Sequence, residues 1–524
     1  MSVRNLAGRV AIVTGASSGI GRATCVALAR SGAHIVAVGR DLERLAATAA
    51  LVADAGGALP ALVLPLDVRS EGDMQRMAER TLESFGRIDI LVNAAGILRA
   101  PGATLRLLAH LPSAEWDEVL DINLRGTFLS NRAVLPAMLA ARSGDILNLS
   151  SKSGRVGIAF DAPYCASKFG VNGLTEAVAE EVRPFGVRVQ SLAPGMFATE
   201  VLQQIGLPQR TDIPPPERVA DVICWMLAMP ADTRLQAPLI EPLDKGAGAG
   251  LHRIAPAKSR SVSKEQTMSF STDLKGKVVI VSGGTGGIGL ATAKAAAALG
   301  ASLVVADIDA ARVATVAAEL EQAGAAGALG VAIDVRLEDD HARLVQATIE
   351  RFGRIDALIV CAGILRKRGT PPKVLVDTST EEFDDVVGIN LKGVFLANRA
   401  VLPTMIAQRS GIIINLSSVQ GLQGRAYDSV YCASKFGVIG LSQAVADEVK
   451  TYGIKVQALM PAAVVTPMWE QNLPAPMPGD AIPPERIADL IVFMLLQPED
   501  TMLVGPVIVP VGARKRRAKT AAAE

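Results

Sequence analysis

A duplication constrains this chain more than any other feature. Residues 10–23 read VAIVTGASSGIGRA and residues 278–291 read VVIVSGGTGGIGLA, while YCASKFGVNGLTE from Tyr164 returns from Tyr431 as YCASKFGVIGLSQ. Two complete units of about 250 residues each are therefore predicted, and a unit of that size buries a core of its own. Each motif in one copy can be checked against its counterpart in the other.

The copies divide the chain into four parts. Residues 243–271 are rich in Gly, Ala, Ser and Lys without apolar periodicity, which is typical of a linker. We predict a first domain over 1–242, a flexible linker over 243–271, a second domain over 272–512 and a basic tail over 513–524. A linker of about 25 residues reaches roughly 25 to 30 Å, so the domains can pack side by side.

Short apolar runs alternate with Ala-rich stretches in both copies, for example HIVAV and VRVQSLA in the first and SLVVAD and IKVQALM in the second. Such runs, separated by helices, are typical of parallel strands buried on both faces. The predicted fold class is α/β, with two tandem Rossmann-like, doubly wound parallel-sheet domains.

Composition excludes several functions. The net charge of +1 gives no field that would select nucleic acid or an anionic membrane, and no apolar run approaches the roughly 20 residues of a membrane span. The four histidines show no pair at metal-ligand spacing, and the five cysteines lack CxxC pairing. We therefore expect a cytoplasmic protein with reduced thiols, no metal, no nucleic-acid partner and no membrane partner.

A glycine-rich turn follows the first strand of each copy. Missing side chains let the backbone approach a pyrophosphate, whose charge is bound by amides at the N-terminus of the next helix. A tight strand-to-helix turn also requires glycine by itself, so both interpretations stay open for this motif alone. An Asp-Val pair after each third strand is placed to bound an adenine ring. The residues are Gly15, Gly19, Ile20, Gly21, Asp67 and Val68 in the first copy, and Gly283, Gly287, Ile288, Gly289, Asp334 and Val335 in the second.

A serine, a tyrosine and a lysine recur at fixed spacing. Each serine ends a strand, each tyrosine lies thirteen residues later, and each lysine follows four residues after that, on the same helical face. The residues are Ser151, Tyr164 and Lys168, and Ser418, Tyr431 and Lys435. Order and spacing that repeat in two copies favour a catalytic role over a structural Tyr and Lys on a buried helix.

With this pattern both copies resemble short-chain dehydrogenase/reductases, over nearly all of the chain except the linker and the tail. The resemblance adds a fourth catalytic position, which Asn123 in DINLRGTF and Asn390 in GINLKGVF match. It implies a bifunctional NAD(P)-dependent oxidoreductase that interconverts secondary alcohols and ketones. It also implies that the helices carrying the Asn and the Tyr pair between the copies as an intramolecular pseudo-dimer, and it allows two chains to form a homodimer.

The chemistry follows from these residue types. A lysine ammonium one turn from a tyrosine, with a positive nicotinamide nearby, favours the phenolate and is expected to bring the tyrosine pKa toward neutrality. Each tyrosine is then the acid/base, and each serine hydrogen-bonds the carbonyl oxygen where negative charge develops. The resemblance gives the lysine a second task, holding the nicotinamide ribose, and gives the asparagine the task of anchoring a water.

The copies differ where their second strand ends, with Gly39-Arg40 in the first and Asp307 in the second. A guanidinium suits a 2′-phosphate, whereas a carboxylate accepts hydrogen bonds from ribose hydroxyls and repels that phosphate. We predict NADP(H) in the first domain and NAD(H) in the second, with a merely solvated charge as the alternative. Further cofactor-binding positions are Asn93, Gly96, Pro194, Gly195 and Thr199 in the first copy, and Gly363, Pro461 and Thr466 in the second.

Two substitutions leave another function open. Val360 replaces Asn93, which the resemblance implies steadies the central sheet, and Ala462 replaces Gly195. The alternative is one active reductase domain whose C-terminal copy is a noncatalytic, cofactor-binding scaffold.

The substrate is less constrained by the sequence. Arg99 and Arg366, with Lys367 and Arg368 in the second copy, are expected in a solvated loop, and binding of a carboxylate or a phosphate is the alternative. A hydroxyacyl thioester, a polyol and a cyclic alcohol all stay open as substrates. Apolar residues that either line a substrate pocket or serve ordinary packing are Leu202, Ile205 and Leu207 in the first copy, and Met468, Trp469 and Leu473 in the second.

Overall fold

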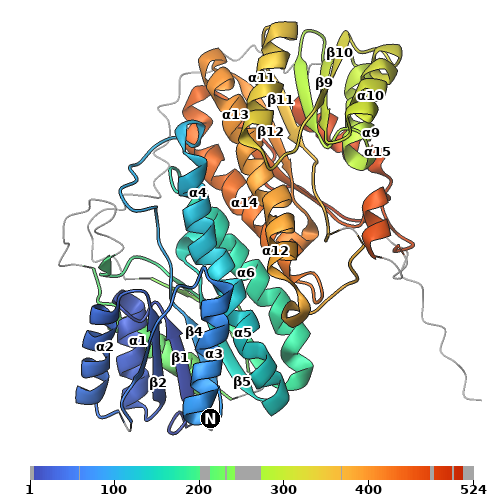
Figure 1. Ribbon diagram of the computed structural model, residues 1–524. Helices are drawn as coiled ribbons and strands as arrows, with labels where there is room; N and C mark the ends of the chain where they lie inside the picture. Colours follow the sequence, from blue (N-terminus) through green and yellow to red (C-terminus); the bar gives the residue numbers. More distant parts are fainter. Residues whose placement is uncertain are drawn as a thin grey trace, which may run out of the picture.

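Two copies of one α/β architecture make up the computed structural model (Figure 1). Each copy contains a seven-stranded parallel sheet, with strand order β3-β2-β1-β4-β5-β6-β7 in the first half and β10-β9-β8-β11-β12-β13-β14 in the second. The chain reverses its direction of travel across each sheet between the third and fourth strands in sequence, which is the predicted doubly wound topology. The structure describes residues 5–57, 59–200, 213–230, 233–241, 273–367, 369–472, 477–498 and 501–510.

The strands agree with the apolar runs of the sequence. Those of the first half are β1 (Val10–Thr14), β2 (His34–Gly39), β3 (Leu62–Pro65), β4 (Ile90–Asn93), β5 (Gly144–Leu149), β6 (Val187–Pro194) and β7 (Leu239–Ile240). Those of the second half are β8 (Val278–Ser282), β9 (Ser302–Asp307), β10 (Gly327–Ala332), β11 (Ala357–Val360), β12 (Gly411–Leu416), β13 (Ile454–Pro461) and β14 (Val507–Ile508). The seventh strand of each half was not predicted, because two residues are too short to form an apolar run.

Helices cover both faces of each sheet. Those of the first half are α1 (Gly19–Arg30), α2 (Leu42–Asp54), α3 (Glu71–Phe85), α4 (Ser113–Leu120), α5 (Gly126–Ala141), α6 (Ala162–Val182) and α8 (Glu217–Ala228). Those of the second half are α9 (Gly287–Ala298), α10 (Ala310–Gln322), α11 (Glu338–Phe352), α12 (Thr380–Val387), α13 (Gly393–Gln408), α14 (Ser429–Val449) and α15 (Pro484–Leu495). Among the helices of the described residues, no segment combines the length and apolarity that crossing a bilayer requires.

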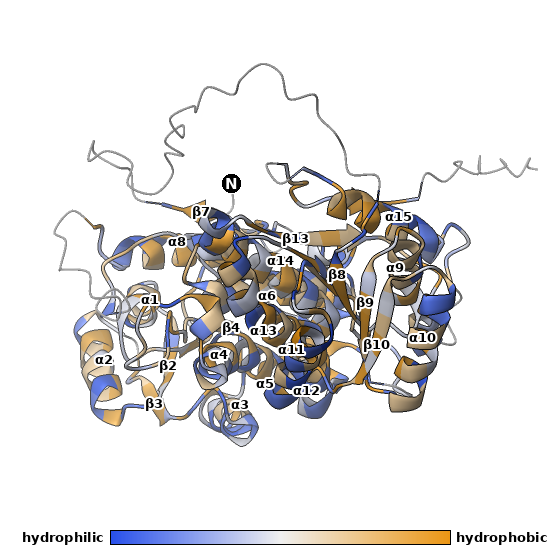
Figure 2. Ribbon diagram, turned by 90° about the horizontal axis from the view of Figure 1, so that it is seen from above, coloured by the Kyte–Doolittle hydropathy of each residue, from blue (hydrophilic) through white to orange (hydrophobic). Residues whose placement is uncertain are grey.

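The core of each half lies between the sheet and its helices. Every residue of β1 and of β8 is buried, as expected for central parallel strands with helices on both sides. Figure 2 shows this arrangement, with mostly hydrophobic strands inside and hydrophilic residues gathered on outer helices such as α11 and α12. The predicted linker over 243–271 and tail over 513–524 lie outside the described residues.

The two halves contact each other along their longest helices. Helix α6 packs along α14 (Figure 1). Glycines allow the close approach, since a Cβ on Gly173 would lie 2.6 Å from the ring of Phe436, and a Cβ on Gly440 would lie 2.6 Å from the ring of Phe169. The helices that carry the two predicted catalytic tyrosines therefore face each other across the contact between the halves.

Aromatic pairs from neighbouring helices extend this contact. Trp116 of α4 stacks on Phe395 of α13 with ring centroids 4.3 Å apart. Phe128 of α5 stacks on Phe383 of α12 with ring centroids 4.5 Å apart. All four rings are buried, so the contact between the halves has the character of a protein core.

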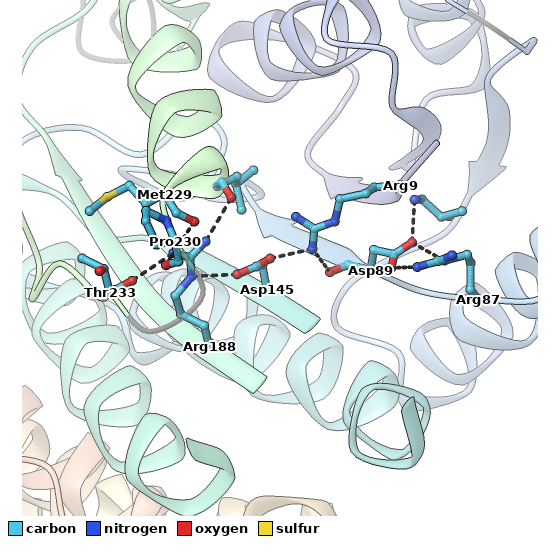
Figure 3. Close-up of polar contacts among 10 residues, drawn as sticks. Arg9, Arg87, Asp89, Asp145, Arg188, Met229, Pro230 and Thr233 are labelled. Carbon is cyan, nitrogen blue, oxygen red and sulfur yellow. Dashed lines mark hydrogen bonds and ion pairs between the residues drawn. The ribbon is translucent and has the colours of Figure 1, made fainter. Parts of the chain in front are cut away.

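A chain of buried ion pairs crosses the N-terminal edge of the first sheet (Figure 3). The Asp145 carboxylate, which is fully buried, accepts hydrogen bonds from Arg9 at 2.5 Å and from Arg188 at 2.7 Å. Arg9 also donates to the carbonyl of Asp89 at 3.0 Å, and the Asp89 carboxylate pairs with Arg87. These charges lie at the opposite end of the strands from the glycine-rich turns, so they support the sheet and not the predicted site.

Candidate active site

The predicted Ser, Tyr and Lys of the first half converge at the C-terminal edge of its sheet. Ser151 follows the end of β5, and its hydroxyl is hydrogen-bonded to Tyr164 in the first turn of α6. Lys168 lies one turn further along α6, with its Nζ 5.7 Å from the centroid of the Tyr164 ring. That Nζ donates to the carbonyl of Leu149 at 2.9 Å, so the end of β5 fixes the lysine.

Asn123 joins this group through a local helix irregularity. It lies in η2, a single π-helical turn (Asp121–Arg125) between α4 and α5, and it is completely buried. Its Oδ1 accepts from the amide of Ile97 at 2.8 Å, and its Nδ2 donates to the Ile97 carbonyl at 2.8 Å and to Ser167 Oγ at 3.0 Å. Ser167 in turn donates to the carbonyl of Tyr164. A π-turn of this kind often marks a functional position, and the sequence pattern did not reveal it.

The second half repeats this geometry. Ser418 is hydrogen-bonded to Tyr431, and Lys435 Nζ lies 5.6 Å from the centroid of the Tyr431 ring and donates to the carbonyl of Leu416 at 2.9 Å. Asn390 lies in a second π-turn, η6 (Gly388–Lys392), and its side chain makes the equivalent bonds to Ile364, to Ser434 and through Ser434 to Tyr431. The structure therefore assembles the same four groups twice.

Burial raises the pKa of each tyrosine and lowers the pKa of the lysine beside it. Desolvation raises the pKa of Tyr164 to about 12 against the hydrogen bond from Ser151, and it also raises the pKa of Tyr431. Desolvation lowers the pKa of Lys168 and of Lys435 to about 8. For the protein groups alone, desolvation thus outweighs the hydrogen bond from the serine at each tyrosine. The expectation that the lysine and a nicotinamide together bring the tyrosine pKa toward neutrality stays a prediction.

The glycine-rich turns are tightly packed. Gly15 has φ +67°, and a Cβ there would lie 2.6 Å from the backbone nitrogen of Ala95; Gly283 has φ +74°, and its Cβ would lie 2.5 Å from that of Ala362. A Cβ on Gly21 or on Gly289 would collide with the carbonyl at the start of its own turn. The fold itself thus requires these glycines, and the same lack of side chains opens the turn to a ligand.

A cavity of 520 Å³ in the second half brings the predicted residues together. Met468 and Trp469, on the 3₁₀ turn η9 (Pro467–Asn472), contribute to its wall, whereas Leu473 lies outside the described residues. Gln420, Arg425 and Asn472 also line it and were not predicted. The predicted residues on its wall are Gly283, Gly287, Ile288, Gly289, Asp307, Asp334, Val335, Gly363, Ser418, Tyr431, Lys435, Pro461 and Thr466. Its volume is in the usual range of ligand pockets.

The first half places its predicted cofactor residues in the same way. A Cβ on Gly96 would lie 3.2 Å from Asn123 Oδ1 and 3.3 Å from Lys168 Nζ, and one on Gly19 would lie 3.2 Å from the Thr199 side chain. The carbonyl of Pro194 accepts from Ser151 Oγ at 3.5 Å, and Gly195 follows at the end of β6. The predicted pocket residues Leu202, Ile205 and Leu207 lie outside the described residues.

The Asp-Val pair after β3 also lies near the site. The Asp67 carboxylate pairs with Arg69 at 2.7 Å. Partial burial opposes ionisation of Asp67, but the hydrogen bonds from Arg69 hold its pKa below the usual value. Val68 is buried against Gly126 at the start of α5.

Asn93 is the exception among the predicted cofactor residues. Its side chain is buried and donates to Asn131 Oδ1 at 2.8 Å and to Asn148 Oδ1 at 2.9 Å. Its own Oδ1 accepts from Ser130 at 2.7 Å. The amide of Asn93 thus belongs to a polar network beneath the site and supports it from the core.

The two halves differ chemically where the second strand ends. In the second half the Asp307 carboxylate accepts from the amide and the hydroxyl of Thr285, at 3.2 and 2.5 Å, and therefore lies beside the glycine-rich turn. In the first half Gly39 has no side chain, and Arg40 follows it in an exposed position. Arg22, which sequence reasoning missed, lies in the first turn of α1 and donates to Thr48 at 3.2 Å.

The arginines in the loops after the fourth strands form buried ion pairs. Arg99 pairs with Asp161 and Arg366 pairs with Asp428, and in each pair both side chains are largely buried. The expectation that these arginines lie in a solvated loop is therefore wrong. Each pair joins the loop after β4 or β11 to the loop that precedes the predicted catalytic tyrosine. Lys367 pairs with Glu381, and Arg368 lies outside the described residues.

Comparisons with known proteins agree with this geometry. The model of the short chain dehydrogenase family matches residues 9–210 and 277–476. The peroxisomal hydratase-dehydrogenase-epimerase of Neurospora crassa is 27% identical over 93% of this chain and 57% of that protein, so the chain spans little more than half the length of this relative. The 3-oxoacyl-(acyl-carrier-protein) reductase of Synechocystis sp. is 37% identical over 43% of this chain and 92% of that protein.

One solved structure matches both halves together. The crystal structure of the C-domain of bacterial malonyl-CoA reductase with NADP superposes with a TM-score of 0.71 and covers 96% of this chain and 99% of that chain. The two sequences are 17% identical, so this likeness concerns the fold. The arrangement of two such sheets in one chain therefore occurs in another protein.

Proposed function

Because the chain belongs to the short-chain dehydrogenase family in both of its halves, we propose that it is a bifunctional oxidoreductase with two active sites. Each site interconverts a secondary alcohol and a ketone with a nicotinamide dinucleotide. The observation that carries the proposal is the assembly of Asn, Ser, Tyr and Lys in both halves, with the same hydrogen-bond partners. The second half keeps the full set, which favours two active sites over an active domain with a noncatalytic scaffold.

The protein groups have separate tasks. The high pKa of Tyr164 keeps its hydroxyl protonated at neutral pH, so it is ready to donate a proton to the oxygen of a ketone under reduction. Ser151 hydrogen-bonds the same oxygen and stabilises the charge that develops there. Lys168, whose pKa of about 8 leaves it mostly protonated at pH 7, adds a positive charge beneath the tyrosine. Their second-half counterparts occupy the same positions. In the oxidation of an alcohol the proton moves the other way, so Tyr431 must first be a phenolate that accepts the hydroxyl proton.

The cofactor assignment rests on the end of the second strand. A bound nicotinamide dinucleotide supplies the hydride donor or acceptor. Residues of the glycine-rich turn would hold its pyrophosphate, and Arg40 with Arg22 would meet the 2′-phosphate of NADP(H) in the first half. Asp307, held beside the turn by Thr285, would accept ribose hydroxyls of NAD(H) in the second half.

The names of the relatives suggest a substrate class. One relative is a 3-oxoacyl-(acyl-carrier-protein) reductase and another a hydratase-dehydrogenase-epimerase, which favours 3-oxoacyl and 3-hydroxyacyl thioesters over polyols and cyclic alcohols. We further propose that the second half oxidises a hydroxyl group with NAD and the first half reduces the resulting ketone with NADPH. A homodimer of chains and a cytoplasmic location stay predictions, and two relatives are named as peroxisomal enzymes.

Two variants test this proposal. A 3-hydroxyacyl thioester is supplied with NAD and NADPH to the wild type, to Tyr164→Phe and to Tyr431→Phe. Loss of the tyrosine hydroxyl is expected to slow the affected site by about 10²- to 10⁴-fold. The ketone should accumulate in Tyr164→Phe, and Tyr431→Phe should leave the alcohol unconsumed. Unchanged products in either variant contradict the proposal.

A further inference from the structure

Each catalytic tyrosine is preceded by a loop that starts at the catalytic serine. We call these segments the substrate loops, residues 152–161 in the first half and 419–428 in the second. In both, the aromatic residue before the last position has a positive φ, +67° at Phe160 and +69° at Tyr427. A non-glycine residue keeps this conformation only where its surroundings impose it. The structure shows that these surroundings come from the opposite half.

A buried glutamate of the second half holds two loops of the first. Glu448, on α14, accepts hydrogen bonds from the backbone amides of Phe160, at 3.3 Å, and Leu108. Phe160 belongs to the substrate loop, and Leu108 begins a short 3₁₀ turn (Leu108–His110) in the loop after β4. The carboxylate therefore ties together the two loops that flank the first active site.

The pseudo-symmetric contact holds the second site. Glu181, on α6 of the first half, accepts from the amide of Tyr427 at 3.0 Å and from the amide of Leu375 at 2.8 Å. Glu181 and Glu448 are 4% and 5% exposed, so bulk water does not replace them as acceptors. A buried carboxylate that accepts two backbone N–H bonds holds the two segments in a fixed position relative to each other.

A second acceptor on each helix completes the arrangement. Gln443 of α14 accepts from the amide of Gly157 at 3.0 Å, and Glu176 of α6 accepts from the amide of Gly424 at 3.0 Å. A Cβ on either glycine would collide with the backbone of the opposite helix. Each substrate loop therefore lies directly against a helix of the other half.

We propose that the halves position each other's active sites, with Glu448 as a positioning residue for the first site and Glu181 for the second. This rests on the proposed function in so far as the sites are catalytic. Neither glutamate touches the reacting groups, and each acts by fixing the loop between the opposite serine and tyrosine. The fused partner is thus part of each site, and its role goes beyond burial of a shared face.

The kinetic test uses the full chain, with a substitution in one half and the activity of the other half as the readout. In a Tyr431→Phe background, where only the first site turns over, Glu448→Ala is expected to raise the KM for the ketone about tenfold, with the KM for the nicotinamide cofactor unchanged. Glu448→Gln should lie closer to the parent, because the amide oxygen still accepts one of the two N–H bonds. Asp447→Ala, at the neighbouring exposed position of α14, is the matched control and should leave both constants unchanged.

Hydrogen exchange tests the same contact without any substrate. Glu448→Ala should speed amide exchange in residues 152–161 of the first half, and Glu181→Ala should speed it in residues 419–428 of the second. Faster exchange confined to the half that carries the substitution, or identical behaviour of the Ala and Gln variants, overturns the inference. If exchange shows the crossed pattern but no variant or wild type turns over a ketone, the proposed function fails and the positioning contact stands.

Discussion

The two halves share the Asn, Ser, Tyr and Lys at the C-terminal edge of their sheets, but their buried charges differ at the opposite edge. In the first half Asp145 is buried between Arg9 and Arg188, whereas in the second half Ile412 stands in its place. Lys455 of the second half, at the position of Arg188, donates to three backbone carbonyls. Hydride-transfer chemistry requires particular groups at fixed positions, whereas a sheet edge requires only that its polar groups find partners.

The polar residues beneath the site also differ between the halves. Asn93 of the first half accepts from Ser130, and in the second half Val360 and Ala397 replace this pair. The serine hydroxyl that would have lost its acceptor is therefore absent as well. The change at Val360 is thus matched by its neighbour, which argues against decay of the second site. The hydroxyl of Ser282 alone lacks a partner there within the described part of the chain.

The buried ion pairs should give the largest effect. Asp145→Ile copies one residue of the second half into the first and leaves Arg9 and Arg188 without their carboxylate. We expect the free energy of unfolding of the first half to fall by about 4 kcal/mol, measured by urea denaturation. Adding Arg9→Lys and Arg188→Lys, which completes the second-half arrangement, should recover most of the loss. If Asp145→Ile alone is as stable as the wild type, the buried arginines do not depend on the Asp145 carboxylate and the prediction is wrong.

The contact between the halves should depend on pH. Burial raises the pKa of Glu181, which also faces Asp428 and Ser429, and of Glu448 from the ordinary 4.5 to about 7. A raised carboxyl pKa means that the folded state binds the proton more tightly than the unfolded state, so this contribution to stability is complete below pH 4.5 and lost as pH rises through 7. The difference corresponds to about 3 kcal/mol per group.

Denaturation of the wild type and of Glu181→Gln/Glu448→Gln between pH 5 and pH 8 measures this effect. The wild type should lose stability relative to the double variant as pH rises, because the glutamines do not titrate. The single variants Glu181→Gln and Glu448→Gln should lose equal amounts of stability as pH rises from 5 to 8 if the halves are equivalent at this contact. Parallel pH profiles for wild type and double variant would contradict the expected linkage.

The network beneath the first site should respond less strongly. Asn93→Val leaves Ser130, Asn131 and Asn148 short of a partner, and we expect a loss of about 2 kcal/mol in the free energy of unfolding. Adding Ser130→Ala and Thr14→Ser, the residues at these positions in the second half, should restore part of it. The reverse change, Val360→Asn alone, inserts an amide without a prepared acceptor set and should also destabilise. A stabilising effect of Val360→Asn would show that the second half has merely lost a favourable residue.

The cofactor preference should shift by the smallest free energy. Arg40→Asp in a Tyr431→Phe background is expected to raise the KM for NADPH about tenfold, or about 1.4 kcal/mol. Asp307→Ala in a Tyr164→Phe background should relax the exclusion of NADPH by a similar factor. Steady-state kinetics with both cofactors measure these values. If the Tyr431→Phe and Tyr164→Phe variants show the same preference between NADPH and NADH, the predicted difference in cofactor between the halves is contradicted.

The sequence by itself determined the duplication, the six longer strands of each half and the Ser, Tyr and Lys that the structure brings together. These features are local, because a strand is an apolar run and the Tyr and Lys lie one turn apart on one helix. The tertiary structure decided the π-turns, the burial of the pairs Arg99–Asp161 and Arg366–Asp428, and the direction of the tyrosine pKa. It also decided the bond from Leu108 to Glu448, which joins residues 340 positions apart. Burial and long-range contacts depend on how the elements pack, and the residue pattern of one segment does not contain that information.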